Sequence, residues 1–183
     1  MFSESEKKYL LSVARNSIEK AVGGQTREIF EKVPAALREP CGAFVTLHMG
    51  GQLRGCIGYL EAVGSLVETV QEAAEKAALQ DYRFNPVTKE EIPELQIEIS
   101  VLTPLKLIRD INDIEIGKHG LMIHLGYNRG LLLPQVATEH GWDRETFLNQ
   151  TARKAGLPST AWKNPSAKIF CFTAEIFSEE PKK

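Results

Sequence analysis

The sequence contains few cysteines, and no two of them lie close together in the sequence. Only Cys41, Cys56 and Cys171 occur among 183 residues, an odd number at wide intervals with no C-x-x-C motif. This pattern argues against zinc-ribbon and thioredoxin-like sites. No metal site is therefore predicted, the cofactor is left open, and the thiols are expected to be reduced, as they are in the cytoplasm.

A long apolar run and an excess of either charge are also missing. No apolar run reaches about 18 residues, the length that suggests a membrane span, and the acidic opening Met1–Glu6 is unlike a signal peptide. The formal net charge is −2, so nucleic acid and anionic membranes are not expected partners. With 43% hydrophobic and 25% charged residues, the composition is that of an ordinary soluble globular protein.

The hydrophobic pattern predicts both helices and strands, without the strict alternation of a parallel α/β fold. Ser3 with Glu6 and Ser65 with Glu68 form capping boxes, which mark the starts of two helices. The periodicity predicts helices over 3–22, 66–79 and 144–155, and strands over 43–48, 52–59, 95–102, 121–125, 131–133 and 169–177.

Neighbouring strands separated by glycine-containing turns are typical of hairpins. We therefore predict an α+β fold of mostly antiparallel sheets with packed helices, in two lobes of unequal size. The larger lobe combines residues 1–104 with 166–183, because the apolar final strand returns to the first sheet. The smaller lobe is an insertion over about 105–165.

The stretch from Gln52 to Tyr59 carries the most distinctive chemistry. In a strand, alternate residues share a face, so Leu53, Ile57 and Tyr59 are expected on a core face and Arg54, Cys56 and Gly58 on the other. A cation beside a thiol favours the nucleophilic thiolate. The glycines Gly55 and Gly58 allow another backbone segment or a ligand to approach closely. The alternative is a structural cysteine beside an arginine that forms an ordinary ion pair.

Several segments resemble the AMMECR1 family. Leu53–Gly58 matches its LRGCIG signature in full. Further similar text lies at Ile99–Leu105 (ISVLTPL), Ile116–Leu121 (IGKHGL), Leu131–Ala137 (LLLPQVA) and Lys154–Pro158 (KAGLP). The resemblance implies a domain without a settled biochemical activity, associated in many prokaryotes with a Memo-like protein and a radical SAM protein. The cysteine triad of radical SAM chemistry is missing from this chain.

Two more residues become candidates through this resemblance. The segment Asp81-Tyr82-Arg83-Phe84 is similar to a family D-P-R-F motif, with tyrosine in place of proline. Arg83 is either the ion-pair partner of Asp81 or a second cation near Cys56. His119 lies between glycines in a turn and is a candidate proton carrier, since histidine titrates near neutrality.

Three functions follow from these residues, and the sequence does not say whether the protein is an enzyme. In the first, Cys56 is a reactive thiolate in a cleft, His119 carries a proton, and Arg54, Gly55, Gly58 and Arg83 bind a small anionic ligand. In the second, the chain is a non-catalytic module that binds a protein partner of the Memo-like and radical SAM system. The third, nucleic-acid binding, is disfavoured by the acidic net charge.

Overall fold

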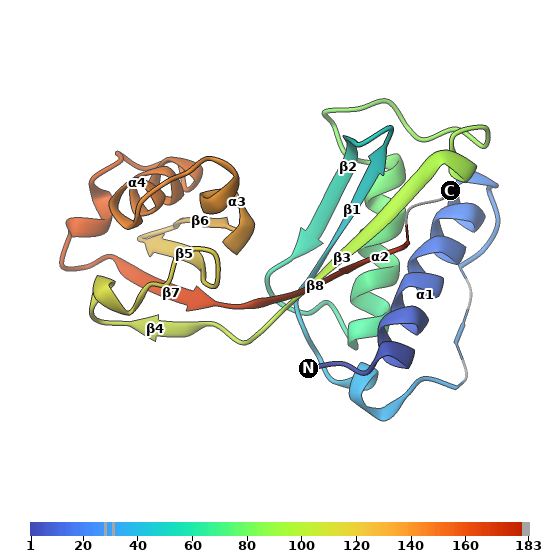
Figure 1. The fold of residues 1–183 in the computed structure, drawn as a ribbon, viewed down its shortest axis with the longest axis horizontal. Helices are drawn as coiled ribbons and strands as arrows, with labels where there is room; N and C mark the ends of the chain where they lie inside the picture. Colours follow the sequence, from blue (N-terminus) through green and yellow to red (C-terminus); the bar gives the residue numbers. More distant parts are fainter. Residues whose placement is uncertain (28, 31, 181–183) are drawn as a thin grey trace. The chain divides into compact units, whose positions relative to one another are not determined.

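Two four-stranded sheets, each with its own helices, make up the fold (Figure 1). The computed structural model describes residues 1–27, 29–30 and 32–180. It confirms the predicted α+β class, and every strand pairing with an assigned register is antiparallel. The chain divides into a first unit, Met1–Leu102 with the segment from Glu175, and a second unit, Thr103–Ala174.

The first unit consists of a sheet and two long helices. Its strands follow the order β2-β1-β3-β8, and α1 and α2 lie together on one side of the sheet (Figure 1). The elements are α1 (Glu4–Val22), β1 (Ala43–Met49), β2 (Gln52–Tyr59), α2 (Leu66–Leu79), β3 (Leu95–Leu102) and β8 (Ala174–Ser178), with 3-10 helices at Ala35–Arg38 and Ile92–Glu94.

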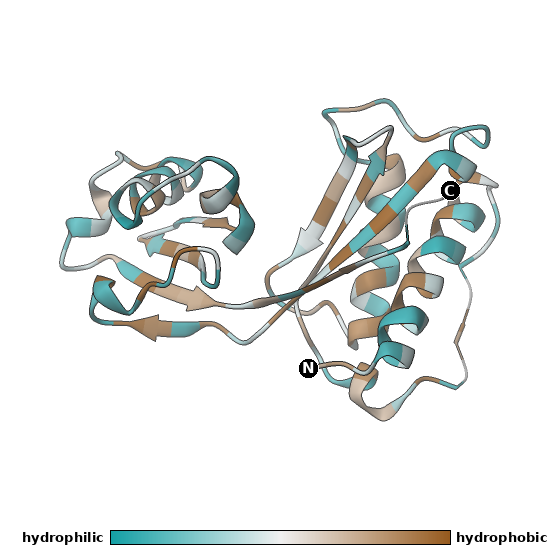
Figure 2. Cartoon of the chain, viewed as in Figure 1, coloured by the Kyte–Doolittle hydropathy of each residue, from teal (hydrophilic) through white to brown (hydrophobic). Residues whose placement is uncertain are grey.

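Alternation along the strands builds the core of this unit. Val45 in β1 and Ile97 and Ile99 in β3 are fully buried, and Figure 2 shows hydrophobic and hydrophilic residues alternating along β3. Small residues such as Ala73 and Ala77 on α2 let the helix approach the sheet closely. The sheet therefore has one face packed against the helices and a second face that carries the polar residues of the same strands.

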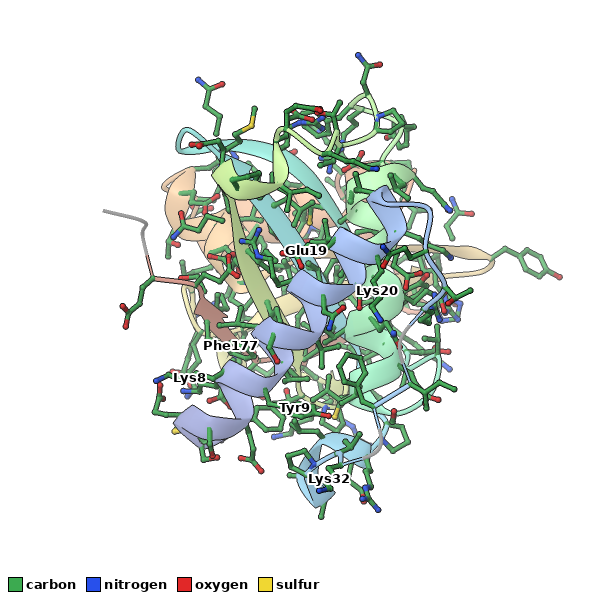
Figure 3. All side chains as sticks on the ribbon, turned by 90° about the vertical axis from the view of Figure 1, so that its right-hand side faces the viewer. Lys8, Tyr9, Glu19, Lys20, Lys32 and Phe177 are labelled. Atoms are coloured by element: carbon green, nitrogen blue, oxygen red, sulfur yellow. The ribbon has the colours of Figure 1, made fainter. Side chains whose placement is uncertain are left out.

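The predicted helix starts are confirmed by their caps. The Ser3 side chain accepts a hydrogen bond from the backbone of Glu6 at the start of α1, and Ser65 and Glu68 form the same capping box at α2. Figure 3, which views the unit from the α1 side, shows the charged Lys8, Glu19 and Lys20 along the helix, away from the sheet. The buried residues of α1 form one stripe along the helix, made up of Leu10, Val13, Ala14, Ser17 and Ile18.

The second unit is a smaller sheet with a separate core. Its strand order is β4-β7-β5-β6, and α4 packs on β5 and β6. Leu121, Ile123, Phe147 and Leu148 are fully buried at the centre of this core. The elements are β4 (Lys106–Ile108), β5 (Gly120–Leu125), β6 (Asn128–Leu132), α3 (Pro134–Glu139), α4 (Arg144–Lys154) and β7 (Lys168–Phe172), with 3-10 helices at Ile111–Asp113 and Ala161–Lys163.

The prediction of one final strand over 169–177 is wrong, because the chain divides there into two strands of different sheets. β7 pairs with β4 and β5 in the second unit, whereas β8 joins the sheet of the first unit. The apolar pattern continues through both strands because each supplies residues to a core. Residues 166–174, predicted in the larger lobe, thus belong to the inserted unit, and 181–183 lie outside the described residues.

Among the described residues, no helix combines the length and the apolar character that crossing a membrane requires. The longest helix, α1, has 19 residues and carries charged side chains along one face.

Candidate functional site

Most of the predicted site residues come together at β2. Arg54, Gly55, Cys56 and Gly58 lie on this strand, which is an edge of the first sheet. Arg83, from the turn after α2, reaches the same strand through a hydrogen bond to the Cys56 carbonyl. His119 belongs to the second unit and forms its contacts there.

A β-bulge changes which residues of β2 face the core. Leu47 of β1 pairs with Gly55 but His48 pairs with Leu53, so Arg54 is the extra residue of the bulge. Ile57 and Tyr59 pack against the core as predicted. Leu53 does not, because the bulge places it opposite His48, and it is 41% exposed. The strict alternation expected for Leu53 is therefore wrong.

The surroundings of the Cys56 thiol raise its pKa. Cys56 is half-buried, and the Thr46 hydroxyl donates a hydrogen bond to its Sγ at 3.3 Å across the β1–β2 pair. Burial raises the pKa of this thiol above its usual value; the Thr46 hydrogen bond and the charge of Arg83 lower it by less. Loss of solvation thus outweighs the neighbouring cation in its effect on this pKa, and a reactive thiolate at Cys56 stays a prediction.

Asp81 and Arg83 satisfy the outer edge of β2 at Cys56. The Asp81 carboxylate accepts a hydrogen bond from the Cys56 backbone N–H at 2.8 Å, and Arg83 Nη2 donates to the Cys56 carbonyl at 3.3 Å. The two side chains also bind each other, with Nε–Oδ1 and Nη2–Oδ2 distances of 2.9 and 2.6 Å. The pair thus occupies the position of a neighbouring strand, which an edge strand otherwise lacks.

The electrostatics of this pair follow from its geometry. Asp81 is only 5% exposed, and the Arg83 guanidinium lowers the pKa of its carboxyl from 3.8 to about 2. The Arg83 pKa is raised by the same contact. Both interpretations of Arg83 therefore hold, since it is the ion-pair partner of Asp81 and also a cation next to Cys56.

Arg54 is engaged by a different segment. Its guanidinium binds both carboxylate oxygens of Glu91 at 2.9 Å and donates to the carbonyls of Asn85 and Pro86 at 3.0 and 3.5 Å. Arg54 therefore fastens the bulge in β2 to the loop that follows α2. This contact lowers the pKa of Glu91. The arginine is directed to this loop and not, as strict alternation predicts, to the thiol.

The two glycines are required by packing inside the unit. A Cβ at Gly55 would lie 2.3 Å from the Ala77 carbonyl oxygen on α2, and one at Gly58 would lie 2.3 Å from the Phe44 ring. Helix backbone and an aromatic ring therefore fill the space in which the sequence analysis expects a ligand. These contacts explain both glycines without a bound molecule.

His119 lies in a tight turn at the start of β5. Its Nδ1 accepts a hydrogen bond from the Glu115 backbone N–H at 3.1 Å, and its own backbone N–H donates to the Glu115 carbonyl. Gly117, with a φ of 84°, allows the left-handed turn between them. The histidine thus closes the loop from 115 to 119, and its ring lines a groove of the second unit.

Sequence reasoning misses three contacts that complete the surroundings of Cys56. Thr46 is recognised only through the strand register, and Glu91, which also accepts the Thr88 backbone N–H, only through its contact with Arg54. Asp81 is recognisable as a charge but not as an acceptor for the strand edge. Among the described residues, no group of three or more His, Cys, Asp and Glu side chains gathers closely enough to hold a metal ion.

The sequence of this chain is similar to those of other known proteins. The AMMECR1 family model matches residues 11–177, and the chain belongs to this family. A protein of Methanothermobacter thermautotrophicus is 42% identical over 97% of this chain and 96% of its own length. Protein TK0174 of Thermococcus kodakarensis is 45% identical over 94% of this chain and 89% of its own length.

A solved structure shows the same fold. The crystal structure of the uncharacterized protein PH0010 from Pyrococcus horikoshii is similar with a TM-score of 0.92 and 41% sequence identity, covering 98% of this chain and 94% of that one. The family and the fold are thereby shown, while the names of these relatives assign no reaction or ligand.

Proposed function

We propose that this chain is a non-catalytic binding module of the cytoplasm, whose protein partner docks on the turn formed by Asp81, Tyr82 and Arg83. The observation that carries the proposal is the saturation of the groups around Cys56. Arg54 is paired with Glu91, Arg83 with Asp81, and the thiol accepts the Thr46 hydroxyl. A nucleophile requires a base within reach and a lowered pKa, and burial raises the pKa of this thiol.

Tyr82 is the residue through which we propose that the partner binds. It is 94% exposed, although Asp81 beside it is buried and the turn is closed by a hydrogen bond from Phe84 N–H to the Asp81 carbonyl. An aromatic side chain held outward on a fixed turn loses little entropy on binding. Tyrosine and arginine are also the residues most enriched among the energetic centres of protein interfaces.

The family resemblance supplies the partner class. Because such domains are associated with a Memo-like protein and a radical SAM protein, we propose that the Memo-like protein is the direct partner. The role of this chain would then be to position that protein relative to the radical SAM component. No reaction takes place at Cys56 in this proposal.

The test is a binding titration of the purified chain with the Memo-like protein from the same organism. Tyr82→Ala is expected to weaken binding by about tenfold, which corresponds to about 1.4 kcal/mol. The matched control is Tyr127→Ala, since Tyr127 is 103% exposed on the hairpin turn of the second unit. Absence of binding by the unmodified chain, or equal loss in both variants, contradicts the proposal.

The second candidate function is the handling of a small anionic molecule at Cys56, Arg54 and Arg83. One observation favours it, since the Arg83 charge and the Thr46 hydrogen bond both act to lower the pKa of the Cys56 thiol. It predicts a thermal shift with carboxylate or phosphate ligands that disappears in Arg54→Ala. The binding-module proposal predicts no such dependence on Arg54.

A further inference from the structure

A groove in the second unit contains several residues that the proposed docking on the Asp81–Arg83 turn does not use. It lies between β4, the 3-10 helix Ile111–Asp113 and the turn from 115 to 119, and its volume is about 770 Å³. Its lining includes Lys106, Arg109, Lys118, His119 and Cys171. All of these residues belong to the second unit, so the groove is complete within it.

The positive charges of this groove are not all neutralised. Lys118 is paired with Glu115 at 2.8 Å. Lys106 and Arg109 are exposed, and neither has an ion-pair or hydrogen-bonding partner for its side chain in the described part of the chain. The Asp113 carboxylate also lines the groove. Once the Lys118–Glu115 pair is set aside, two cations face one acidic group, in contrast to the paired arginines around Cys56.

His119 adds a hydrogen-bond donor with a defined position of its proton. Because Nδ1 accepts from the Glu115 N–H, the proton of the neutral ring is on Nε2. The ring is half-buried, and its orientation is fixed by that hydrogen bond. An N–H donor held in this way needs no rearrangement to meet a negatively charged oxygen.

We infer that this groove binds a small oxyanion, the carboxylate or phosphate group of a small molecule, through Arg109, Lys106 and the Nε2–H of His119. A guanidinium matches both groups through two parallel hydrogen bonds, and a lysine adds charge. A metal ion is the less suitable occupant, since among the residues described no His, Cys, Asp and Glu set gathers to ligate one.

The inference also explains a part of the sequence that packing leaves open. In the IGKHGL segment, Gly117 is accounted for by its left-handed turn. Gly120 is accounted for by packing, because a Cβ there would lie 2.3 Å from the Phe172 ring. The position of His119 within the groove gives its side chain a role beyond closing the turn.

The experiment is an NMR titration of the full chain with inorganic phosphate and, separately, with acetate at constant ionic strength. We expect saturable shifts of backbone amides at 106–119 and 171 with at least one of the two anions. Shifts that increase linearly without saturation, or that spread over the surface lysines of both units, overturn the inference.

Three variants make the test specific. Arg109→Gln is expected to weaken binding by about fivefold or more, whereas Arg153→Gln, which removes the same charge from an exposed site on α4 that does not line the groove, changes it by less than about twofold. His119→Asn retains an acceptor for the Glu115 N–H and removes the Nε2 donor, so the turn remains and affinity falls. Equal effects of Arg109→Gln and Arg153→Gln, or full affinity in His119→Asn, contradict the assignment.

Discussion

The Asp81 carboxylate accepts the backbone N–H of Cys56 at 2.8 Å, a bond that in the interior of a sheet would go to the next strand. Arg83, bound to the same carboxylate, donates to the Cys56 carbonyl at 3.3 Å and completes the substitution. Asp81 and Arg83 therefore complete the hydrogen bonding of β2 at Cys56, on the open edge of the sheet. This relationship is one of the observations that support the proposed binding function.

Removal of the Asp81 carboxylate should destabilise the first unit. Asp81→Ala leaves the Cys56 N–H and the Arg83 guanidinium without their acceptor, at a cost of about 2–3 kcal/mol in the free energy of unfolding. Urea denaturation followed by far-UV circular dichroism measures this difference. Glu115→Ala, which removes an exposed ion pair in the second unit, is the control and should change stability by less than about 0.5 kcal/mol. Equal effects of the two variants would contradict the role given to Asp81.

The same contact predicts how stability depends on acid. The folded-state pKa of Asp81 is lowered from 3.8 to about 2, so between these values the unfolded chain binds more protons than the folded chain. The stabilisation is complete above the unfolded pKa and is lost as pH falls through the folded one. We expect the difference in unfolding free energy between the natural chain and Asp81→Asn to shrink as pH falls from about 4 to about 2. A constant difference over this range would show that Asp81 does not titrate in this way.

Cys56 should react slowly with alkylating reagents. Burial raises the pKa of its thiol, so near neutral pH the thiolate fraction is smaller than in a free cysteine. The modification rate, followed by mass spectrometry of the peptide that contains Cys56, should lie below that of free cysteine and rise as pH increases. Modification faster than that of free cysteine near neutral pH would restore the catalytic hypothesis.

Gly55 should not accept a side chain. In Gly55→Ala the new Cβ meets the Ala77 carbonyl at 2.3 Å, and the displacement of β2 from α2 is expected to cost about 1–3 kcal/mol or more. The control is Gly51→Ala, where φ is +76° and no atom lies within 4 Å. That variant carries only the left-handed backbone penalty of about 1–2 kcal/mol. Thermal denaturation should therefore rank Gly55→Ala as the less stable variant.

Arg54 should be replaceable by neither lysine nor alanine. Its fork binds both oxygens of Glu91 and two backbone carbonyls, a geometry that a single ammonium group does not reproduce. We expect Arg54→Lys to lose about half or more of the stability lost in Arg54→Ala, the latter being about 1–3 kcal/mol. Complete retention of stability in Arg54→Lys would show that charge alone is sufficient.

Local sequence patterns predicted the secondary structure well where contacts between residues a few positions apart determine it. The capping boxes at Ser3 and Ser65 and the strand β3 depend on neighbours within a few residues, and the structure confirms them. The alternation of burial holds in the first half of β3, whereas every residue from Ile99 to Leu102 is buried. The division of the final apolar stretch at Thr173 could not be seen, because both halves are apolar and only their partners differ.

The sequence predicted which residues lie near Cys56 along β2, but not which residues their side chains contact. The sequence places Arg54 two residues from Cys56, yet a single-residue bulge directs the arginine to Glu91, which lies 37 residues further along the chain. A bulge has no clear signature in one sequence, and the partner of a long side chain depends on loop geometry. Burial of the thiol is likewise a property of the packed sheet rather than of the residues beside it.

The place of β8 in the first sheet has a consequence for synthesis on the ribosome. β3 is translated long before β8, and the whole of the second unit, Thr103–Ala174, emerges between them. A nascent chain must therefore keep one side of β3 unpaired until the inserted unit has left the exit tunnel. Since Arg15 of α1 pairs with Glu179, α1 gains this contact only after the segment that follows the inserted unit has been synthesised.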